Sequence, residues 1–131
     1  MKYLIDTNLI IDLLRGDKNL QRKLQEFAKE GIAISVISLA EIIEGAYLSQ
    51  IPKENIKKFQ DALSSYGIFV VDIDTKIAET YGIFQAIQER KGNRLSGFDM
   101  LIAASCIYYD LFLISQDKAF KAVEELKLKI I

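Results

Sequence analysis

The chain begins MKYLIDTNLIIDLLRG at residues 1–16, and this stretch decides the fold class. The apolar run of residues 1–5 predicts a short buried strand, and the polar residues that follow it, headed by Asp6, are of the kind that cap a helix. A short helix over residues 8–14 is predicted next, ended by Gly16. A strand that leads directly into a helix is the unit from which parallel α/β sheets are built.

The same alternation of short apolar runs and amphipathic segments continues along the whole chain. No two-residue hairpin signal separates any pair of strands. The pattern therefore predicts one α/β domain over residues 1–131, with three α/β/α layers and a parallel central sheet of four or five strands. The predicted strands cover residues 1–5, 32–36, 68–71, 111–114 and 128–131, and the predicted helices with their caps cover residues 8–14, 17–31, 38–47, 52–67, 74–87, 96–109 and 120–126.

The composition excludes several kinds of active site. The 131 residues contain no histidine and one cysteine. Catalytic Ser-His-Asp or Cys-His groups, histidine-ligated zinc and haem held by a histidine are excluded together. One cysteine makes neither an intrachain disulfide nor a cysteine zinc site, and it fits a reducing compartment. Chemistry must therefore depend on carboxylates, hydroxyls, amides, lysine, arginine or a metal bound by oxygen.

The charge balance argues against a surface that coats nucleic acid. Seventeen basic and eighteen acidic residues give a net charge of −1, whereas a basic nucleic-acid module has a pI above about 9. A local basic rim around an acidic centre remains compatible with this balance. No targeting segment is evident, and the longest apolar stretch, residues 100–109, falls well short of the ~20 residues that span a bilayer. We expect a soluble, cytoplasmic protein with no membrane contact.

Four acidic residues flank predicted elements that meet at one edge of the sheet. Asp6 follows the first strand, and Glu41 lies in the first turn of the helix after the second. Asp99 begins the helix that leads into the fourth strand, and Asp117 follows that strand. Ligands of parallel sheets gather outside the carboxyl ends of the strands, so we expect the four carboxylates to lie near one another.

Each acid also has a purely structural explanation. Asp6 and Asp117 could simply cap helices, and Ser38 with Glu41 has the spacing of a capping box. Taken together, however, the carboxylates would repel one another, and Asp99 opens a helix with almost no polar face. No lysine or arginine directly flanks Asp6, Glu41 or Asp99. A hard divalent cation, Mg²⁺ or Mn²⁺, is the natural neutralising group.

Four short segments carry a resemblance to a known family. They are LIDTN at residues 4–8, SLAEIIEG at 38–45, FDMLIAA at 98–104 and LISQDKAF at 113–120. In this order and spacing they resemble the PIN-domain ribonucleases, and most closely the VapC-type toxins of prokaryotic toxin–antitoxin pairs. The similarity spans essentially the whole chain and implies a PIN-like fold.

The resemblance also implies roles for individual residues. Asn8 would hydrogen-bond the carboxylates, and Ser115 would orient the site from a position where the family often has threonine. Gln116 stands where asparagine is frequent, which is a minor departure. The four residues that would form the acidic catalytic and metal-binding group are Asp6, Glu41, Asp99 and Asp117.

The implied activity is metal-dependent hydrolysis of RNA phosphodiester bonds. One or two Mg²⁺ or Mn²⁺ ions would activate a water and stabilise charge on the phosphate. The family further implies a homodimer, a small cognate antitoxin that fills the cleft, and a structured RNA substrate such as a transfer RNA. A basic rim would bind the RNA, with Arg94 the first candidate because it lies nearest to Asp99 in sequence. The rim candidates are Arg15, Lys18, Arg90, Lys91, Arg94 and Lys118.

Two alternatives from other classes remain open at this stage. A receiver-like signalling module would also bind magnesium, but it needs adjacent acids after the first strand, where this chain has Thr7 and Asn8. Its acceptor and lysine would be Asp72 and Lys118, which fit only loosely. The second alternative is a non-catalytic PIN scaffold that binds protein or RNA, and the intact acidic group argues against it.

Overall fold

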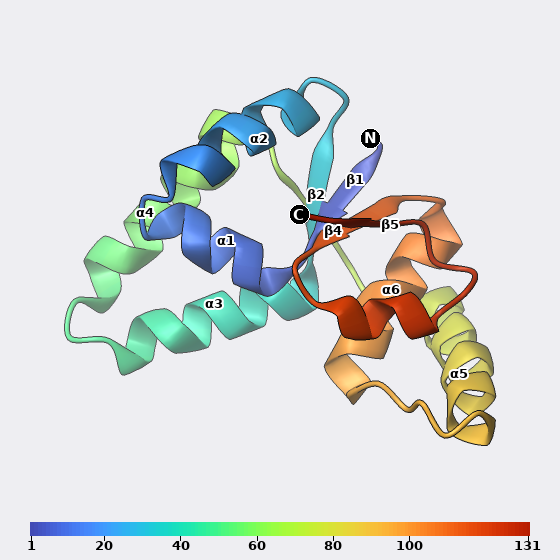
Figure 1. Cartoon of the computed structure of the whole chain (residues 1–131). Coiled ribbons are helices and arrows are strands. Elements are labelled where there is room, and N and C mark those ends of the chain that lie inside the picture. The colour runs from blue at the N-terminus through green and yellow to red at the C-terminus, as the bar shows by residue number, and fades with distance from the viewer.

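Five parallel strands form one central sheet in a computed structural model that describes residues 1–131 (Figure 1). The spatial order is β3-β2-β1-β4-β5, so β1 is the central strand. The predicted parallel sheet is therefore confirmed, with five strands. The strands are β1 (Tyr3–Ile5), β2 (Ile32–Ser35), β3 (Phe69–Val71), β4 (Phe112–Ser115) and β5 (Leu128–Ile130).

Helices cover both faces of this sheet. Figure 1 shows α1, α2 and α4 on one side of the strands and α5 and α6 on the other. None of the helices is long and apolar enough to cross a lipid bilayer. The helices are α1 (Thr7–Leu14), α2 (Lys18–Ala28), α3 (Val36–Leu48), α4 (Pro52–Tyr66), α5 (Thr75–Arg90) and α6 (Gly97–Tyr109), and a short 3₁₀ helix, η1, covers Lys118–Ala122.

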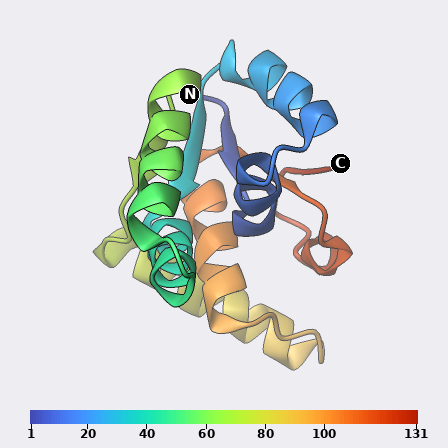
Figure 2. The same ribbon diagram turned by 90° about the vertical axis from the view of Figure 1, so that its left-hand side faces the viewer.

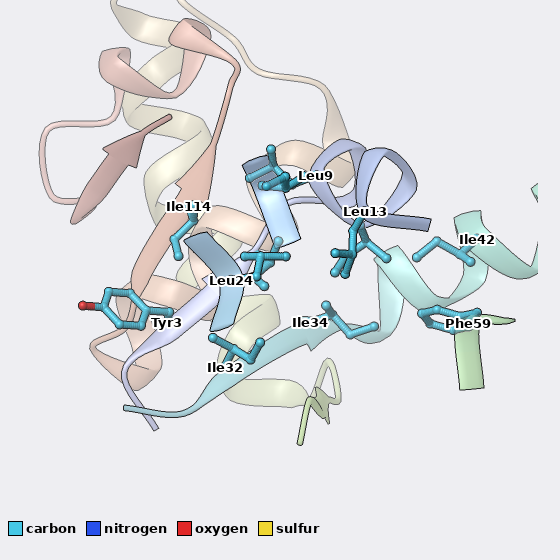
Figure 3. Packing of buried hydrophobic residues seen from close by; sticks show 12 residues of the cluster. Tyr3, Leu9, Leu13, Leu24, Ile32, Ile34, Ile42, Phe59 and Ile114 are labelled. Carbon is cyan, nitrogen blue, oxygen red and sulfur yellow. The ribbon is translucent and has the colours of Figure 1, made fainter. Parts of the chain in front are cut away.

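Period-two alternation in the central strand divides the core into two clusters. Tyr3 and Ile5 face α1 and α2, whereas Leu4 faces α6 and η1. Figure 3 shows the first cluster, in which Leu9 of α1 and Leu24 of α2 pack with residues of the strands. A strand buried on both faces must be apolar at every position, which is why β1 is a continuous apolar run.

Side-chain caps set where most helices begin. Asp17 accepts a hydrogen bond from the backbone N–H of Leu20, and Asp74 accepts one from that of Ile77, both at 3.0 Å. These two caps were predicted from the sequence. Gly67 ends α4 with a φ of 61°, a left-handed conformation that glycine adopts without steric cost.

Two predicted helix boundaries are wrong. The third helix begins at Val36 and is capped by Ser35, so Ser38 lies inside its first turn and does not form the predicted capping box with Glu41. The predicted helix over residues 120–126 is instead η1. Asp117 caps η1 by accepting a hydrogen bond from the N–H of Ala119. Several serines near a helix start are equivalent by propensity alone, and tertiary contacts select among them.

Candidate functional site

Asp6 lies at the point in the sheet where successive strands of the chain switch from one side of β1 to the other. The chain adds β2 and β3 on one side of β1 and then crosses over to add β4 and β5 on the other. The backbone N–H of Asp6 donates to the carbonyl of Ile114 at 3.0 Å, which extends the pairing of β1 with β4 by one residue. In α/β sheets, ligands bind in the crevice outside such a switch point. The topology therefore places Asp6 at the preferred ligand position.

Two hydrogen bonds hold the Asp6 carboxylate in a buried position. The Ser115 hydroxyl donates to Oδ2 at 2.7 Å, and the Thr7 backbone N–H donates to Oδ1 at 2.9 Å. Only 6% of Asp6 is exposed, and Ser115 is fully buried at the end of β4. The Ser115 hydroxyl also accepts a bond from the N–H of Asp117 at 2.9 Å. One serine thus connects two of the four predicted acids.

The electrostatic surroundings of Asp6 favour the binding of a cation. Burial raises the pKa of Asp6, and the hydrogen bonds from Ser115 and Thr7 oppose that rise. The charges of Asp99 and Asp117 raise the same pKa further, so both carboxylates lie within electrostatic reach of Asp6. None of the chain's ion pairs involves any of the four predicted acids. The negative charge at this edge has no protein counter-ion.

A chain of hydroxyl groups connects Glu41 to the same edge. The Thr7 Oγ1 atom lies 3.0 Å from Glu41 Oε1 and 2.7 Å from Ser38 Oγ. An ionised carboxylate only accepts, so the single Thr7 proton goes to Glu41 and Ser38 donates to Thr7. Sequence reasoning missed Thr7 and Ser38. The sequence signal that could have identified Thr7 is a short hydroxyl-bearing residue directly after an acid at the end of a strand.

The other predicted site residues differ in how far they are exposed to solvent. Asp99 is half-buried, whereas Glu41 and Asp117 are exposed. No three acidic side chains lie close enough together to hold one metal ion between them. Asn8 is exposed and makes no side-chain hydrogen bond, so the role predicted for it is taken in this structure by Thr7.

The donor set still fits a hard divalent cation. Carboxylate oxygens are the ligands that Mg²⁺ and Mn²⁺ prefer, and these ions retain several waters, so a protein need supply only part of their coordination. Each oxygen of Asp6 accepts one hydrogen bond and keeps a second lone pair free. The residues present are therefore compatible with a cation, although they do not form a closed cage.

The basic residues predicted to bind RNA fall into two groups, those that form an ion pair and those that do not. Arg94 forms an ion pair with Glu89 at 2.9 Å, and Lys91 forms one with Glu124 at 3.8 Å. Lys118 is exposed beside Asp117 and, like Arg15, makes no ion pair. Arg15 lines a groove that also contains Glu41. Arg94 was the first candidate for RNA binding because it lies near Asp99 in sequence. In the structure Arg15 is the better candidate, because it is unpaired and lines the same groove as Glu41.

The single cysteine supplies no nucleophile. Cys106 is buried in α6, and this burial raises the pKa of its thiol far above the ordinary value. A buried thiol of this kind stays protonated and unreactive at neutral pH. The chemistry of the site therefore depends on carboxylates, hydroxyls, amides, basic side chains or a metal bound by oxygen, and not on a thiol.

The raised pKa of Asp6 predicts a specific pH dependence of stability. An Asp whose folded pKa exceeds its unfolded value of about 3.9 contributes stability that is fully present below that value and is lost as pH rises through the folded pKa. In Asp6→Asn the side chain carries no charge; its Oδ1 can still accept from the Thr7 N–H, while its Nδ2 can only donate to the Ser115 hydroxyl. This change of hydrogen bonding is the same at both pH values and cancels in the comparison. In EDTA, we therefore expect the free energy of unfolding of Asp6→Asn relative to wild type to be higher at pH 7.5 than at pH 4. Urea unfolding at the two pH values measures this difference, and equal values would contradict the pKa direction.

The fold and the site together define a class of protein. It is an α/β/α domain that carries an acidic centre at the switch point of a parallel sheet. The family model of the PIN domain matches residues 3–126, and the chain belongs to the PIN-domain family.

Similar proteins share nearly the whole chain. A Haemophilus influenzae protein named Ribonuclease VapC2 is 31% identical over 119 residues, which cover 89% of this chain and 87% of that protein. The Shigella flexneri tRNA(fMet)-specific endonuclease VapC is 30% identical over 103 residues, or 79% of this chain and 76% of that one. In a crystal structure of VapBC2 from Rickettsia felis bound to a promoter DNA fragment, one chain superposes with a TM-score of 0.91. That chain is 29% identical, and the alignment covers 99% of this chain and 98% of that one.

Proposed function

We propose that this protein is a ribonuclease, as its VapC relatives are named, and that it acts as the toxin of a toxin–antitoxin pair. The observation that carries the proposal is the buried Asp6 carboxylate at the switch point, held by Ser115 and facing the charges of Asp99 and Asp117 with no basic partner. The family membership and the names of the relatives support the same activity. A receiver-like module is no longer needed to explain the acidic site.

The proposed cofactor is Mg²⁺ or Mn²⁺, for which Asp6 would supply direct oxygen ligands. Asp99, Asp117 and Glu41 would add negative charge around the ion and reach it through its waters, because no three acids lie close enough to hold it between them. When bound, such an ion stabilises the charge that develops on the phosphate and lowers the pKa of a water. The protein's own part is positioning. Ser115 and the Thr7 backbone orient Asp6, and the Thr7 hydroxyl orients Glu41.

The proposed substrate is a structured RNA. The Shigella flexneri relative is named for specificity toward tRNA(fMet), which makes that tRNA the first substrate to test here. A carboxylate site is strongly negative, so a polyanion needs cations to approach it. Four residues of the predicted basic rim are exposed, make no ion pair and are available for this purpose: Arg15, Lys18, Arg90 and Lys118.

We expect RNA cleavage to require a divalent cation. Purified protein incubated with tRNA(fMet) in Mg²⁺ or Mn²⁺ should yield discrete fragments, because a metal ion supplies several kcal/mol of charge stabilisation at the phosphate. Chelation by EDTA should slow cleavage by about 10³-fold or more, since each 1.36 kcal/mol corresponds to a factor of ten. Gel separation of end-labelled RNA measures both rates.

The control is the re-addition of excess Mg²⁺ to the chelated sample, which should restore cleavage. A rate that EDTA leaves unchanged would contradict the metal-dependent mechanism. A complete lack of cleavage of all RNAs in both metals would instead favour the non-catalytic PIN scaffold.

The proposed protein partners are a small antitoxin and a second copy of this chain. Solved relatives from Rickettsia felis and Salmonella typhimurium are VapBC complexes, which supports an antitoxin partner. Large apolar side chains exposed near the end of α3, such as Tyr47 and Leu48, are typical of surfaces that bind another protein. Light scattering on the purified chain measures whether it is a dimer.

A further inference from the structure

A groove between α1, α3 and α4 runs beside the acidic edge of the sheet. Figures 1 and 2 show these three helices side by side, and the groove between them has a volume of about 340 Å³. Glu41 lines it, so it joins the site described above. Ligand pockets in proteins begin at about 300 Å³, so the groove can hold a group the size of one nucleotide.

The polar side chains of the groove are available to a ligand. Arg15, the C-cap residue of α1, and Lys58 of α4 line it, are exposed, and make no ion pair. Asn55 also lines it and donates one amide N–H to the Ser49 hydroxyl at 2.9 Å. Its amide oxygen and second N–H remain free. The groove thus combines two unpaired cations with one amide that keeps its oxygen and one N–H free, and apolar residues such as Ile42 form its walls.

A glycine keeps this groove open. Gly45 lies inside α3 and lines the groove, and a Cβ built on it would meet no atom within 4 Å. A glycine in a helix interior destabilises the helix relative to alanine, so local stability does not explain its presence. A side chain at position 45 would enter open space next to the groove that Gly45 lines.

We propose that the groove holds the nucleotide of the RNA that adjoins the cleaved bond, with Arg15 and Lys58 on its phosphates and the Asn55 amide on the base edge. This inference rests on the proposed ribonuclease function and deepens it. Two unpaired cations next to a carboxylate site complement a polyanion that must pass from the groove to that site. A protein segment in the groove is the competing occupant.

The first test removes the cations one at a time. Binding of a short fluorescein-labelled RNA to Asp99→Asn protein, which is expected not to cut it, is measured by anisotropy over a range of salt concentrations. Lys58→Ala and Arg15→Ala should each lower the slope of log K against log salt by about 0.7, the value for one phosphate contact on a single strand. Lys57→Ala is the matched control, because Lys57 is the neighbouring residue on α4 and pairs with Asp61 at 3.5 Å outside the groove.

The second test fills the groove. Gly45→Leu should weaken RNA binding and raise the KM for cleavage at least tenfold, with a melting temperature no lower than that of the wild type. Gly82→Leu is its matched control, because Gly82 is also exposed inside a helix, α5, and its Cβ would meet nothing within 4 Å. It should leave binding and KM unchanged.

The outcomes separate this inference from the function on which it rests. One outcome is that the wild-type protein cleaves RNA while Lys58→Ala, Arg15→Ala and Gly45→Leu all keep the wild-type KM and salt slope. This outcome would overturn the nucleotide subsite and favour a protein segment as the occupant of the groove. It would leave the proposed ribonuclease function intact. A wild-type protein that neither binds nor cleaves RNA would overturn both. Loss of binding in the groove variants but not in their two controls supports the subsite.

Discussion

Replacing Asp99 by asparagine is expected to abolish RNA cleavage, with a loss of at least about 10³-fold, while the fold survives. Asp99 is half-buried in the first turn of α6 and acts electrostatically on Asp6. Asparagine has the same shape but removes one of the negative charges that would attract a cation. Losing a ligand charge at a metal-dependent site removes several kcal/mol of transition-state stabilisation.

The structural cost of this substitution is small. The backbone N–H of Asp99 still donates to the Ser96 hydroxyl at 3.1 Å, so the helix start is preserved. The lost carboxylate near the helix N-terminus costs about 0.3–1 kcal/mol of stability. The loss of activity therefore greatly exceeds the loss of stability, and the two are separated by measuring cleavage rate and thermal unfolding on the same sample.

Asp110→Asn is the matched control for Asp99→Asn. Asp110 lies at the other end of α6 in a left-handed conformation with a φ of 58°, which asparagine also tolerates. Its ion pair with Lys127 is exposed and contributes little. Wild-type cleavage by Asp110→Asn is expected. Equal cleavage by the Asp99 variant and the wild type would remove Asp99 from the site.

Replacing Ser115 by alanine is expected to lower the cleavage rate by about 10- to 100-fold, the range found when a partner of a metal ligand is lost. The substitution leaves Asp6 buried with only one of its two hydrogen bonds, and it removes the acceptor of the Asp117 N–H. Leaving buried polar groups unpaired also costs about 1–3 kcal/mol of unfolding free energy. Both effects arise because Ser115 is fully buried where β1 and β4 end.

A pH profile distinguishes positioning from simple destabilisation. The hydrogen bond from Ser115 lowers the pKa of Asp6, so its loss should move the acidic limb of the rate profile to higher pH. Ser105→Ala is the matched control. Ser105 is equally buried, but its hydroxyl donates to the Leu101 carbonyl within α6 at 2.9 Å. Identical pH profiles for the Ser115 variant and the Ser105 variant would show that Ser115 has no special role at the site.

Local patterns predicted most of the fold correctly. The apolar run around Leu4 could only be a strand buried on both faces, and Asp17 and Asp74 each began a helix as predicted. Asp6 and Asp117 were singled out because each follows a strand, and Asp99 because it opens a helix; parallel strands bring such positions to one edge. Glu41 was expected in the first turn of its helix but lies beyond it, because α3 begins at Val36. The burial of Asp6 agrees with its predicted place at the end of the central strand.

The contacts around those acids could not be predicted in the same way. Thr7 and Ser38 are separated by 31 residues, and their hydroxyls meet only because α1 and α3 pack together on the sheet. Ser35 and Ser38 are also equivalent caps by propensity, but in the structure Ser35 caps α3 and the Ser38 hydroxyl contacts Thr7. Arg94 is near Asp99 in sequence, yet its guanidinium pairs with Glu89.

The strand–helix alternation and the parallel sheet could be read from the amino-acid sequence alone, and the four acids at the carboxyl edge of that sheet were predicted from it. These follow from periodicity, capping and burial, which act over a few residues. Only the tertiary structure decided which hydroxyl holds which carboxylate, which cations remain unpaired, and that Gly45 leaves a groove open beside Glu41. Those features depend on side chains from distant helices meeting in space, and hydrogen bonds and ion pairs form only where that packing brings their atoms within about 3–4 Å.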